Sequence, residues 1–355
     1  MRIFKQVLLL LNATMCFSLA SCNSNSKTSG SGDTNKHVHD YKTQTIQATC
    51  MIDGYTLHYC SCGDSFKDSI VHASGHNYVE REQNYKCSKC DRYEDEGFTF
   101  ELITSEMAKY NDAYKGRVNT YDIKSVSSTS LEGGIVSVPR KHLGCEVTGI
   151  YRGAFYNVGR SMVELRISSC IKYIGSNLIC YDGQMNKPSY EIALEKIYFN
   201  PNCSEINISH SSFQYCKKVN DVSMPNECIS RFNHDDMIGN HFLFEDTQYY
   251  MTNKTVENGL SYLFNMLLES DKTKFNDSIS IKNGTRIISN YSFQGNTNLK
   301  TITMPSSLVY VGKKAFAQCV SLSTIIFNGT ESQFNSILIE DNSFQDCKTI
   351  SYEFN

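Results

Sequence analysis

A recurring spacing of apolar residues governs the C-terminal two-thirds of the chain. From about residue 136 onward, several segments share an apolar-x-x-apolar-x-apolar pattern. The last two apolar positions alternate with period two, as in a short half-buried strand, and the step before them fits a turn that leads into the strand. We therefore expect one short strand per repeat. The triplets are Met162/Leu165/Ile167, Leu194/Ile197/Phe199, Val219/Val222/Met224, Leu299/Ile302/Met304 and Leu322/Ile325/Phe327.

A small residue followed by phenylalanine recurs between these strands. Phe293 and Phe316 are 23 residues apart, and so are Leu299 and Leu322, which sets the length of one coil. Because a repeat cannot bury its apolar face alone, we expect the phenylalanines of successive coils to stack inside the array. The phenylalanines are Phe155, Phe213, Phe293, Phe316 and Phe344, and a cysteine follows three of them at Cys216, Cys319 and Cys347.

Two stretches interrupt the repeats, and one precedes them. Residues 181–192 and roughly 239–280 break the spacing, and we expect them to emerge on one face or edge of the array. Within the second, residues 260–268 are apolar and fit either a short helix or an added strand. Residues 98–102 and 120–123 alternate with period two, which predicts a strand pair that caps the N-terminal end.

The repeats resemble the BspA-like leucine-rich repeats, with their Ala-Phe-x-x-Cys-x-x-Leu and Ile-x-Ile-Pro phrases. The best match is Tyr310–Leu322, and Met304-Pro305 fits the strand-ending phrase. Leu178-Ile179 replaces Ala-Phe in one unit, so the coil there is expected to be irregular. The resemblance implies a β-rich leucine-rich-repeat solenoid over residues 97–355, with short strands stacked in a right-handed coil. It also implies host matrix proteins, other cells or glycans as ligands.

Composition agrees with short strands and with a binding role. The chain has no Trp, few Pro, many Tyr and Phe, and a net charge of −3 with scattered Lys and Arg. This mixture favours strands separated by polar turns and gives no reason to expect nucleic acid as a partner. Cysteines at repeat positions are expected to be buried thiols that act as small hydrophobes, although disulfides are the alternative.

The first 22 residues have the pattern of an export signal. Arg2 and Lys5 precede an apolar run, and Leu19-Ala20-Ser21-Cys22 resembles the bacterial lipobox. The resemblance implies cleavage before Cys22 and lipidation of its thiol, which would anchor the protein to a membrane at the extracellular face of the bacterial envelope. An ordinary secretory signal is the alternative. Residues 23–36 are rich in Ser, Asn and Gly and predict a flexible linker.

Residues 37–96 form a Cys/His-rich module. His39 and Cys50 recur as His76 and Cys87 with a period of 37 residues. A second alignment places Cys60-x-Cys62 against Cys87-x-x-Cys90, and the sequence does not choose between the two. The module resembles the small His/Cys repeats of bacterial surface proteins, which look like zinc ribbons.

Thiolates and imidazoles are the ligands of tetrahedral zinc, and a module with so few aliphatic residues needs a cross-link to fold. We therefore expect structural zinc, with an odd number of cysteines arguing against complete disulfide pairing. Disulfides are the alternative. The candidate ligands are Cys50, Cys60, Cys62, His76, Cys87 and Cys90.

Nothing in the sequence predicts an enzyme. No nucleophile elbow, phosphate loop or paired-histidine zinc motif is present, and His234-Asp235-Asp236 is the one histidine outside the module that has adjacent carboxylates. The expected function is a cell-surface binding or adhesion protein whose solenoid takes an extracellular protein or glycan. The alternative is a structural or metal-handling envelope protein in which the Cys/His module is the active part.

Overall fold

The computed structural model describes residues 38–355, apart from residues 82, 181–189, 210, 227, 234–243, 245 and 275–276. The predicted export signal with Cys22, the linker 23–36, most of the first interruption and His234-Asp235-Asp236 therefore lie outside the described residues. The chain forms two compact units, Met1–Ile46 with Thr56–Ser69, and Gln47–Tyr55 with Ile70–Asn355.

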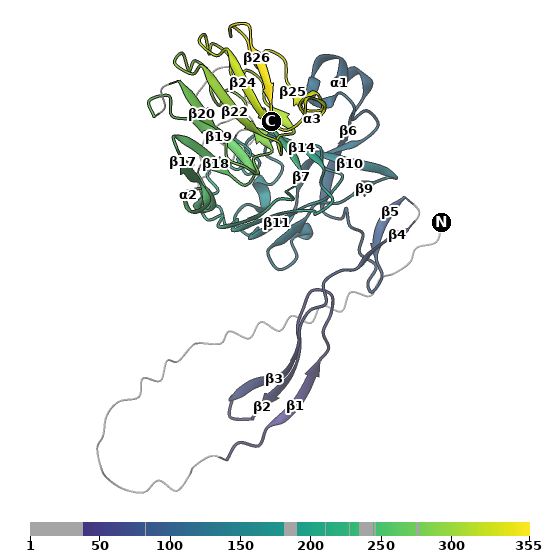
Figure 1. Ribbon diagram of the computed structural model, residues 1–355. Helices are drawn as coiled ribbons and strands as arrows, with labels where there is room; N and C mark the ends of the chain where they lie inside the picture. Colours follow the sequence, from purple (N-terminus) through teal and green to yellow (C-terminus); the bar gives the residue numbers. More distant parts are fainter. Residues whose placement is uncertain are drawn as a thin grey trace, which may run out of the picture. The chain divides into compact units, whose positions relative to one another are not determined.

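The first unit is built on a small sheet with little apolar core. Most side chains of its strands are exposed, and ring contacts supply the packing. Figure 1 labels its three strands. His58 stacks on Phe66 with 4.4 Å between ring centroids, and Tyr41 meets Phe66 edge-on at 5.0 Å. So small a core gives little stability by itself. The strands, in sheet order, are β1 (Lys42–Ile46), β2 (Gly54–Tyr59) and β3 (Ser65–Val71).

The second unit begins with a hairpin and a cap. The cap strands β6 and β7 pair antiparallel, and β7 pairs parallel with β10 of the first coil, which confirms the predicted strand pair. Arg117 and Asp122 are buried in the cap, with 2.6 Å between Nη1 and Oδ1. The elements are β4 (Tyr78–Arg81), β5 (Asn84–Cys87), β6 (Phe98–Leu102), α1 (Ser105–Tyr110), β7 (Tyr121–Val126), β9 (Lys141–His142) and β10 (Cys145–Ile150).

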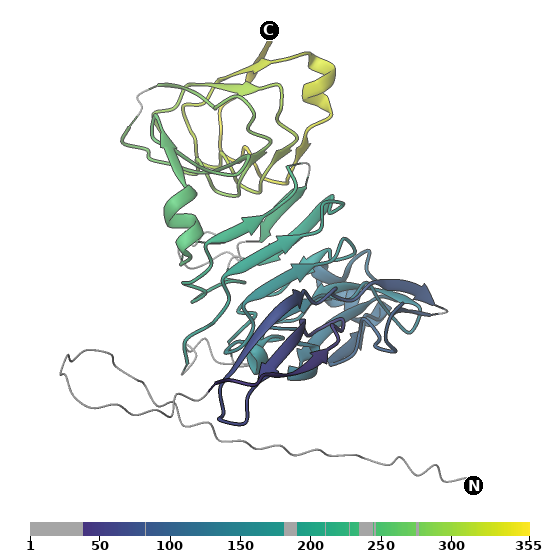
Figure 2. The same ribbon diagram turned by 90° about the horizontal axis from the view of Figure 1, so that it is seen from below.

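The predicted strands form a parallel ladder along the solenoid, in two sheets. Leu165 pairs with Ile197 and Ile197 with Val222, while Ile302 pairs with Ile325. The fold class and the predicted strand triplets are confirmed, and Figure 2 shows the teal strands side by side. The first sheet is β8 (Ile135–Ser137), β11 (Glu164–Ile167), β13 (Lys196–Phe199) and β15 (Asp221–Ser223); the second is β20 (Ser278–Ser280), β22 (Thr301–Pro305), β24 (Thr324–Asn328) and β26 (Ser351–Phe354).

A second ladder, which the apolar spacing did not predict, lies on another side of the coil. Several of its strands are two residues long, too short for a period-two signal. Gly175 and Gly312 follow such strands at places where a Cβ would lie 2.8 Å from the nitrogen of Arg152 and 2.6 Å from that of Asn290. The strands are β12 (Tyr173–Ile174), β14 (Glu205–Ser209), β16 (Ile229–Asn233), β19 (Met266–Ser270), β21 (Ile287–Ile288), β23 (Tyr310–Val311) and β25 (Leu338–Ile339).

The apolar stretch at residues 260–268 forms strands rather than a helix. β18 (Leu260–Leu263) pairs antiparallel with β17 (Thr255–Glu257) and with β19, at the edge of the second ladder. The helices α2 (Gln248–Asn253) and α3 (Glu331–Asn335) are short. Within the described part of the chain, no helix has both the length and the apolar character to cross a bilayer.

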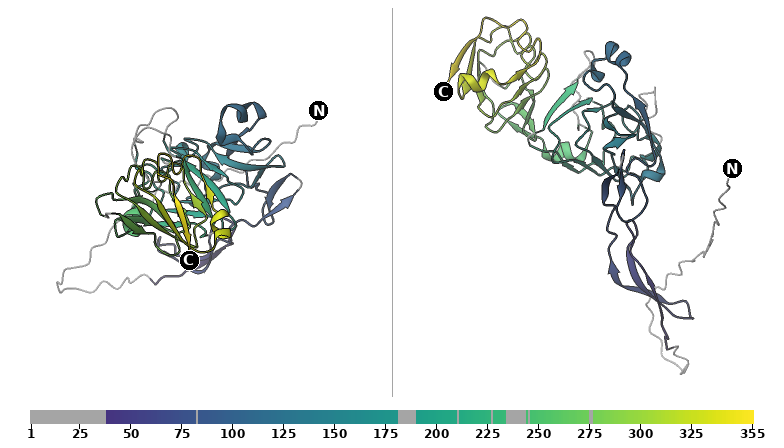
Figure 3. Two further views of the ribbon diagram at one scale, coloured as in Figure 1. Left: turned by 45° about the horizontal axis from the view of Figure 1, so that its top comes forward. Right: turned by 90° about the vertical axis from the view of Figure 1, so that its right-hand side faces the viewer.

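Stacked phenylalanines fill the coils, as predicted. Phe316 lies between Phe293 and Phe344, with ring centroids 4.9 and 5.0 Å away and nearly parallel planes. Cys319 and Cys347 donate their S–H groups to the carbonyls of Phe293 and Phe316, each over 3.1 Å. The last two coils therefore repeat both a ring contact and a thiol hydrogen bond. Figure 3 shows the backbone of this part of the chain in green to yellow.

Candidate metal centre and binding face

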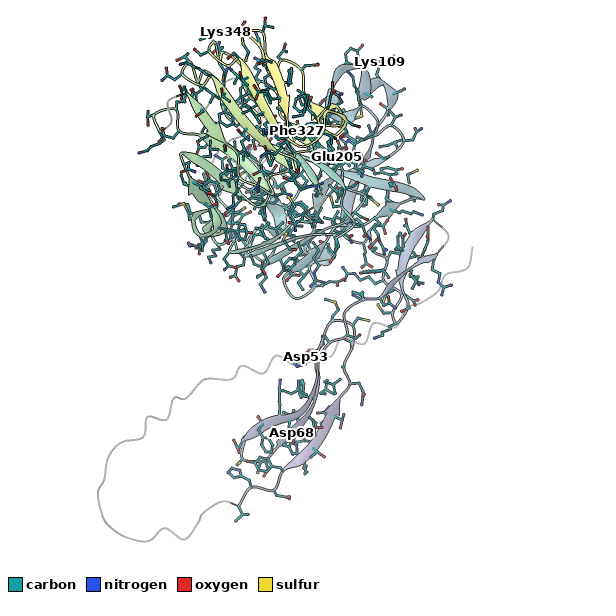
Figure 4. All side chains as sticks on the ribbon, viewed as in Figure 1. Asp53, Asp68, Lys109, Glu205, Phe327 and Lys348 are labelled. Atoms are coloured by element: carbon teal, nitrogen blue, oxygen red, sulfur yellow. The ribbon has the colours of Figure 1, made fainter. Side chains whose placement is uncertain are left out.

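Backbone contacts bring Cys50 close to the hairpin that follows it. The amide of Ser74 donates to the carbonyl of Thr49 over 3.3 Å, and the amide of Ala73 donates to Oδ1 of Asp53 over 2.6 Å. These contacts form a neck, defined as residues 49–53 together with 72–74, and Asp53 is labelled there in Figure 4. The neck places Cys50 beside β5, which ends at Cys87.

Four of the six candidate ligands come together in the second unit. Donor atoms of Cys50, His76, Cys87 and Cys90 all lie within 4.8 Å of one another. The sulfurs of Cys50 and Cys87 are 3.8 Å apart, and Sγ of Cys90 is 3.3 Å from Nδ1 of His76. Two sulfurs at about 2.3 Å from a tetrahedral zinc are separated by about 3.8 Å, whereas a disulfide bond is about 2.05 Å long. The donor set therefore fits a tetrahedral metal ion.

The imidazole of this group has a carboxylate behind it. Nε2 of His76 lies 3.0 Å from Oε1 of Glu132, and the His76 side chain is almost fully buried. Glu132 also accepts a hydrogen bond from the hydroxyl of Tyr78 over 3.2 Å and pairs with Nε of Arg92 at 3.2 Å. Nε2 is buried next to the carboxylate but does not have hydrogen-bond geometry with it. The position of Glu132 is that of the carboxylates that support metal-binding histidines.

The thiols of the group differ in acidity. Although burial opposes it, hydrogen bonds from the Lys89 amide and the His76 side chain lower the pKa of Cys87 to about 6. Burial and hydrogen bonds with Cys87 and Cys90 raise the pKa of Cys50. Cys87 is therefore a thiolate near neutral pH, which is the form that binds metal.

The hairpin that carries Cys87 is fixed to the start of the solenoid. Nε of Arg140 lies 3.0 Å from Oε1 of Glu94, and its guanidinium sits 3.4 Å from the ring centroid of Tyr85. Nδ1 of His142 is 2.7 Å from Oδ2 of Asp95. The four-donor group thus belongs to the same unit as the repeats and is held against their first coil.

The other two candidate ligands belong to a separate group in the first unit. Donor atoms of Cys60 and Cys62 lie within 4.8 Å of each other and of His39. His39 was noted in the sequence repeat but was not among the candidate ligands. Its equivalence to His76, combined with the alignment of Cys60-x-Cys62 on Cys87-x-x-Cys90, was the signal that could have found it.

The solvent side of the sheet β8-β11-β13-β15 carries charged and aromatic side chains in register. Glu164 pairs with Lys196 and Lys196 with Asp221, while Arg166 lies opposite Tyr198. The hydroxyl of Tyr198 donates to Oδ2 of Asp221 over 2.5 Å. This surface, formed by Glu164, Arg166, Lys196, Tyr198 and Asp221, is called the charged face below.

The corresponding side of the sheet β20-β22-β24-β26 is different. Ser278, Thr301, Thr324 and Ser351 lie opposite one another in successive strands and form a row of hydroxyl groups. This row is called the hydroxyl face below. The two halves of the solenoid therefore present surfaces of different chemistry on equivalent strands.

The repeats match a known family. The family model described as the BspA type leucine rich repeat region matches residues 134–229 and 270–354, in six copies, just over half of the chain. The chain belongs to the BspA-type leucine-rich-repeat family. No curated protein matches it.

Solved structures of bacterial leucine-rich-repeat proteins are similar to this BspA-type chain. The Treponema pallidum leucine rich repeat protein is 15% identical, with 72% of this chain and 83% of that chain covered and a TM-score of 0.28. A leucine rich cell surface protein of Faecalibacterium prausnitzii is 15% identical, with 74% and 94% covered and a TM-score of 0.21. A leucine-rich repeat protein of Bacteroides ovatus is 14% identical, with 73% and 78% covered and a TM-score of 0.21.

The BspA-type match separates the two candidate sites. The charged face and the hydroxyl face both lie on strands within the matched residues 134–229 and 270–354. The Cys/His groups lie before residue 134, so the match says nothing about them. The two faces therefore belong to the repeats that define the family, whereas both Cys/His groups lie outside the matched residues.

Proposed function

We propose that this protein recognises an extracellular protein or glycan through its solenoid, at the bacterial surface. The observation that carries the proposal is the charged face, a set of side chains repeated in register along parallel strands. Strands of a parallel ladder lie about 4.8 Å apart, so the face offers a rigid and extended row of contacts.

The chemistry of the charged face supports a macromolecular ligand. Tyr and Arg are enriched at the centres of protein interfaces because they combine apolar area with hydrogen bonding. Arg166 is more than half exposed, and the hydroxyl of Tyr198 is already oriented by Asp221. An ordered aromatic side chain loses little conformational entropy when a ligand binds.

The test measures binding of residues 23–355, which lack Cys22, to arrays of matrix proteins, glycans and bacterial cells. We expect saturable binding that the double variant Arg166→Ala/Tyr198→Ala weakens at least about tenfold, the loss typical of interface hot spots. The matched control is Thr301→Ala/Thr324→Ala on the hydroxyl face, which is expected to bind like the unchanged protein. Equal binding by the unchanged protein and both double variants would show that the charged face is not the binding site.

A second role is a structural metal at Cys50, His76, Cys87 and Cys90. The observation that favours it is the buried pairing of His76 with Glu132, which is the support that metal-binding histidines have. Such an ion would join the neck to the hairpin, where few apolar residues are buried. The test compares the metal content of the purified protein with that of Cys50→Ser/Cys87→Ser. Equal metal content in the two proteins would exclude this role.

Membrane attachment is proposed from the lipobox-like residues 19–22. A lipid on Cys22 would hold the solenoid at the envelope while residues 23–36 extend it from the surface. Incorporation of a labelled fatty acid by bacteria that express the full chain is the measurement. Loss of the label in Cys22→Ala is expected, and label retained in that variant would place the anchor elsewhere.

A further inference from the structure

The loop between β2 and β3 places two thiols on one side of a tight turn. The amide of Gly63 donates to the carbonyl of Cys60 over 3.0 Å. The amide of Cys60 in turn donates to the carbonyl of Asp64 over 2.8 Å. Gly63 has a φ of +94°, a conformation that side-chain-bearing residues rarely adopt. The turn therefore sets the spacing of Cys60 and Cys62 through the backbone.

His39 completes this group from the segment before β1. Its Nδ1 lies 3.2 Å from Sγ of Cys62, and its ring stacks on Tyr41 with 5.3 Å between centroids. The hydroxyl of Tyr41 donates a hydrogen bond to Oδ2 of Asp64. This bond ties the segment that carries His39 to the thiol loop.

Two properties distinguish this group from the one around Cys87. Among the residues that the structure describes, three donor atoms of the His39 group lie within 4.8 Å of one another, whereas the Cys87 group has four such atoms. Its imidazole is also far more accessible, since the side chain of His39 is 42% exposed and that of His76 is 4% exposed. Asp64 is nearby, with Oδ2 3.7 Å from Nδ1 of His39, but is not one of the three.

We propose that His39, Cys60 and Cys62 bind a second Zn²⁺ whose fourth coordination position is open to an exogenous donor. Two thiolates and one imidazole suit zinc, which is bound by four protein ligands in closed sites and keeps a place for water or another ligand where the protein supplies three. Two thiolates neutralise the charge of the ion, so the position accepts water, an imidazole or a thiolate. The chain then holds two zinc ions of unequal exchange rate.

The carboxylate of Asp64 lies next to the imidazole of this group and supplies a hydrogen-bond acceptor there. It lies close to His39 and is already oriented by Tyr41. A donor molecule that carries an N–H or O–H group next to its ligating atom would meet both the ion and the carboxylate. The site is therefore suited to a histidine or cysteine side chain presented by another molecule at the exposed end of this unit.

Metal stoichiometry of the full chain is the first test. We expect two zinc ions per chain, falling to one in His39→Ala/Cys62→Ser and to one in Cys50→Ser/Cys87→Ser. The matched control is His58→Gln, a histidine of the same sheet that pairs with Asp68 at 3.0 Å and is outside the group; it is expected to keep two. A single zinc that is unaffected by His39→Ala/Cys62→Ser would overturn the proposal.

The open position is tested with cobalt in place of zinc, since the visible spectrum of Co²⁺ responds to its ligands. In Cys50→Ser/Cys87→Ser loaded with one Co²⁺, added imidazole should shift the absorption bands, and a chelator should remove the ion faster than from the four-donor site. In His39→Ala/Cys62→Ser, imidazole should leave the spectrum unchanged. No imidazole response in the first variant would mean that a donor of the chain itself fills the fourth position, and the proposal would fail.

Discussion

Nε2 of His76 lies 3.0 Å from Oε1 of Glu132, while Nδ1 of the same ring faces the sulfur of Cys90 at 3.3 Å. The two nitrogens therefore have opposite roles, one directed at a carboxylate and the other at the thiols. Glu132 comes from the cap region next to the solenoid, some fifty residues along the chain from His76. The carboxylate thus couples the four-donor group to the start of the repeats.

Glu132→Gln should weaken metal binding at the four-donor group by about 10- to 100-fold, the usual effect of removing a carboxylate behind a metal-binding histidine. Competition with a zinc chelator measures this. Glu101→Gln is the matched control, because Glu101 forms a part-buried pair with Lys124 at 3.1 Å and is not a member of the four-donor group. Equal affinities in the two variants would contradict a supporting role for Glu132.

Thiol accessibility should report the state of the metal groups. Treatment of the native protein with a chelator is expected to increase alkylation of Cys87 and Cys90, while Cys216 and Cys319 stay unmodified. Burial raises the pKa of Cys319 to about 12, so this thiol is neither exposed nor ionised near neutral pH. Mass spectrometry of the alkylated peptides gives the answer, and early labelling of Cys319 would show that its coil opens.

Phe316→Ala should lower the free energy of unfolding by about 3–5 kcal/mol, because the ring is fully buried between two others and its loss leaves a cavity. Denaturant titration is the measurement. The control is Val320→Ala in the same coil, where the side chain is 46% exposed and a change within about 0.5 kcal/mol is expected. Similar losses in both would mean that the ring stack adds no stability of its own.

Arg117→Ala should destabilise the cap by about 3–5 kcal/mol, since it leaves the buried carboxylate of Asp122 without its partner. Burial raises the pKa of Asp122 above its usual value even beside Arg117, and loss of the guanidinium removes an interaction that lowers this pKa. The folded-state pKa of Asp122 is therefore higher in the variant, and stability is lost as pH rises from the unfolded-state pKa through the folded-state pKa. The deficit should therefore be smaller near pH 4 than near pH 7.

The matched control for the cap is Lys124→Ala, which breaks a part-buried pair at the edge of the cap and should change stability by less than about 1 kcal/mol at either pH. Unfolding curves at the two pH values compare both variants with the unchanged protein. A deficit in Arg117→Ala that does not depend on pH would show that Asp122 keeps its charge without the guanidinium.

The ladder around Leu165, Ile197 and Val222 was predictable because each strand has alternating apolar residues that point inward. The second ladder was not, because a strand such as Tyr173–Ile174 has no alternation to detect and owes its conformation to the coils on either side. Stacking of Phe293 on Phe316 followed directly from their equal spacing in neighbouring repeats.

Six candidate metal ligands were predictable by residue type, but their division into groups was not. Cys50 precedes Cys60 and Cys62 by only a few residues, and yet it lies with Cys87 because the neck folds the chain back on itself. Separation along the sequence does not predict which cysteines lie close together when a hairpin lies between them. The charged face was also missed, since the polar positions of each repeat acquire meaning only when the register places Arg166 opposite Tyr198.

The neck has a mechanical consequence. Because residues 49–53 are bonded to residues 72–74, the chain from β2 to β3 is a side branch of the path that joins β1 to the solenoid. A pull applied between the two ends of the chain would load the neck contacts, and an ion shared by Cys50 and Cys87 would carry part of that load. The loop with Cys60 and Cys62 lies on this side branch, and an ion shared with His39 and the bond from Tyr41 to Asp64 would pass load to it from the segment before β2.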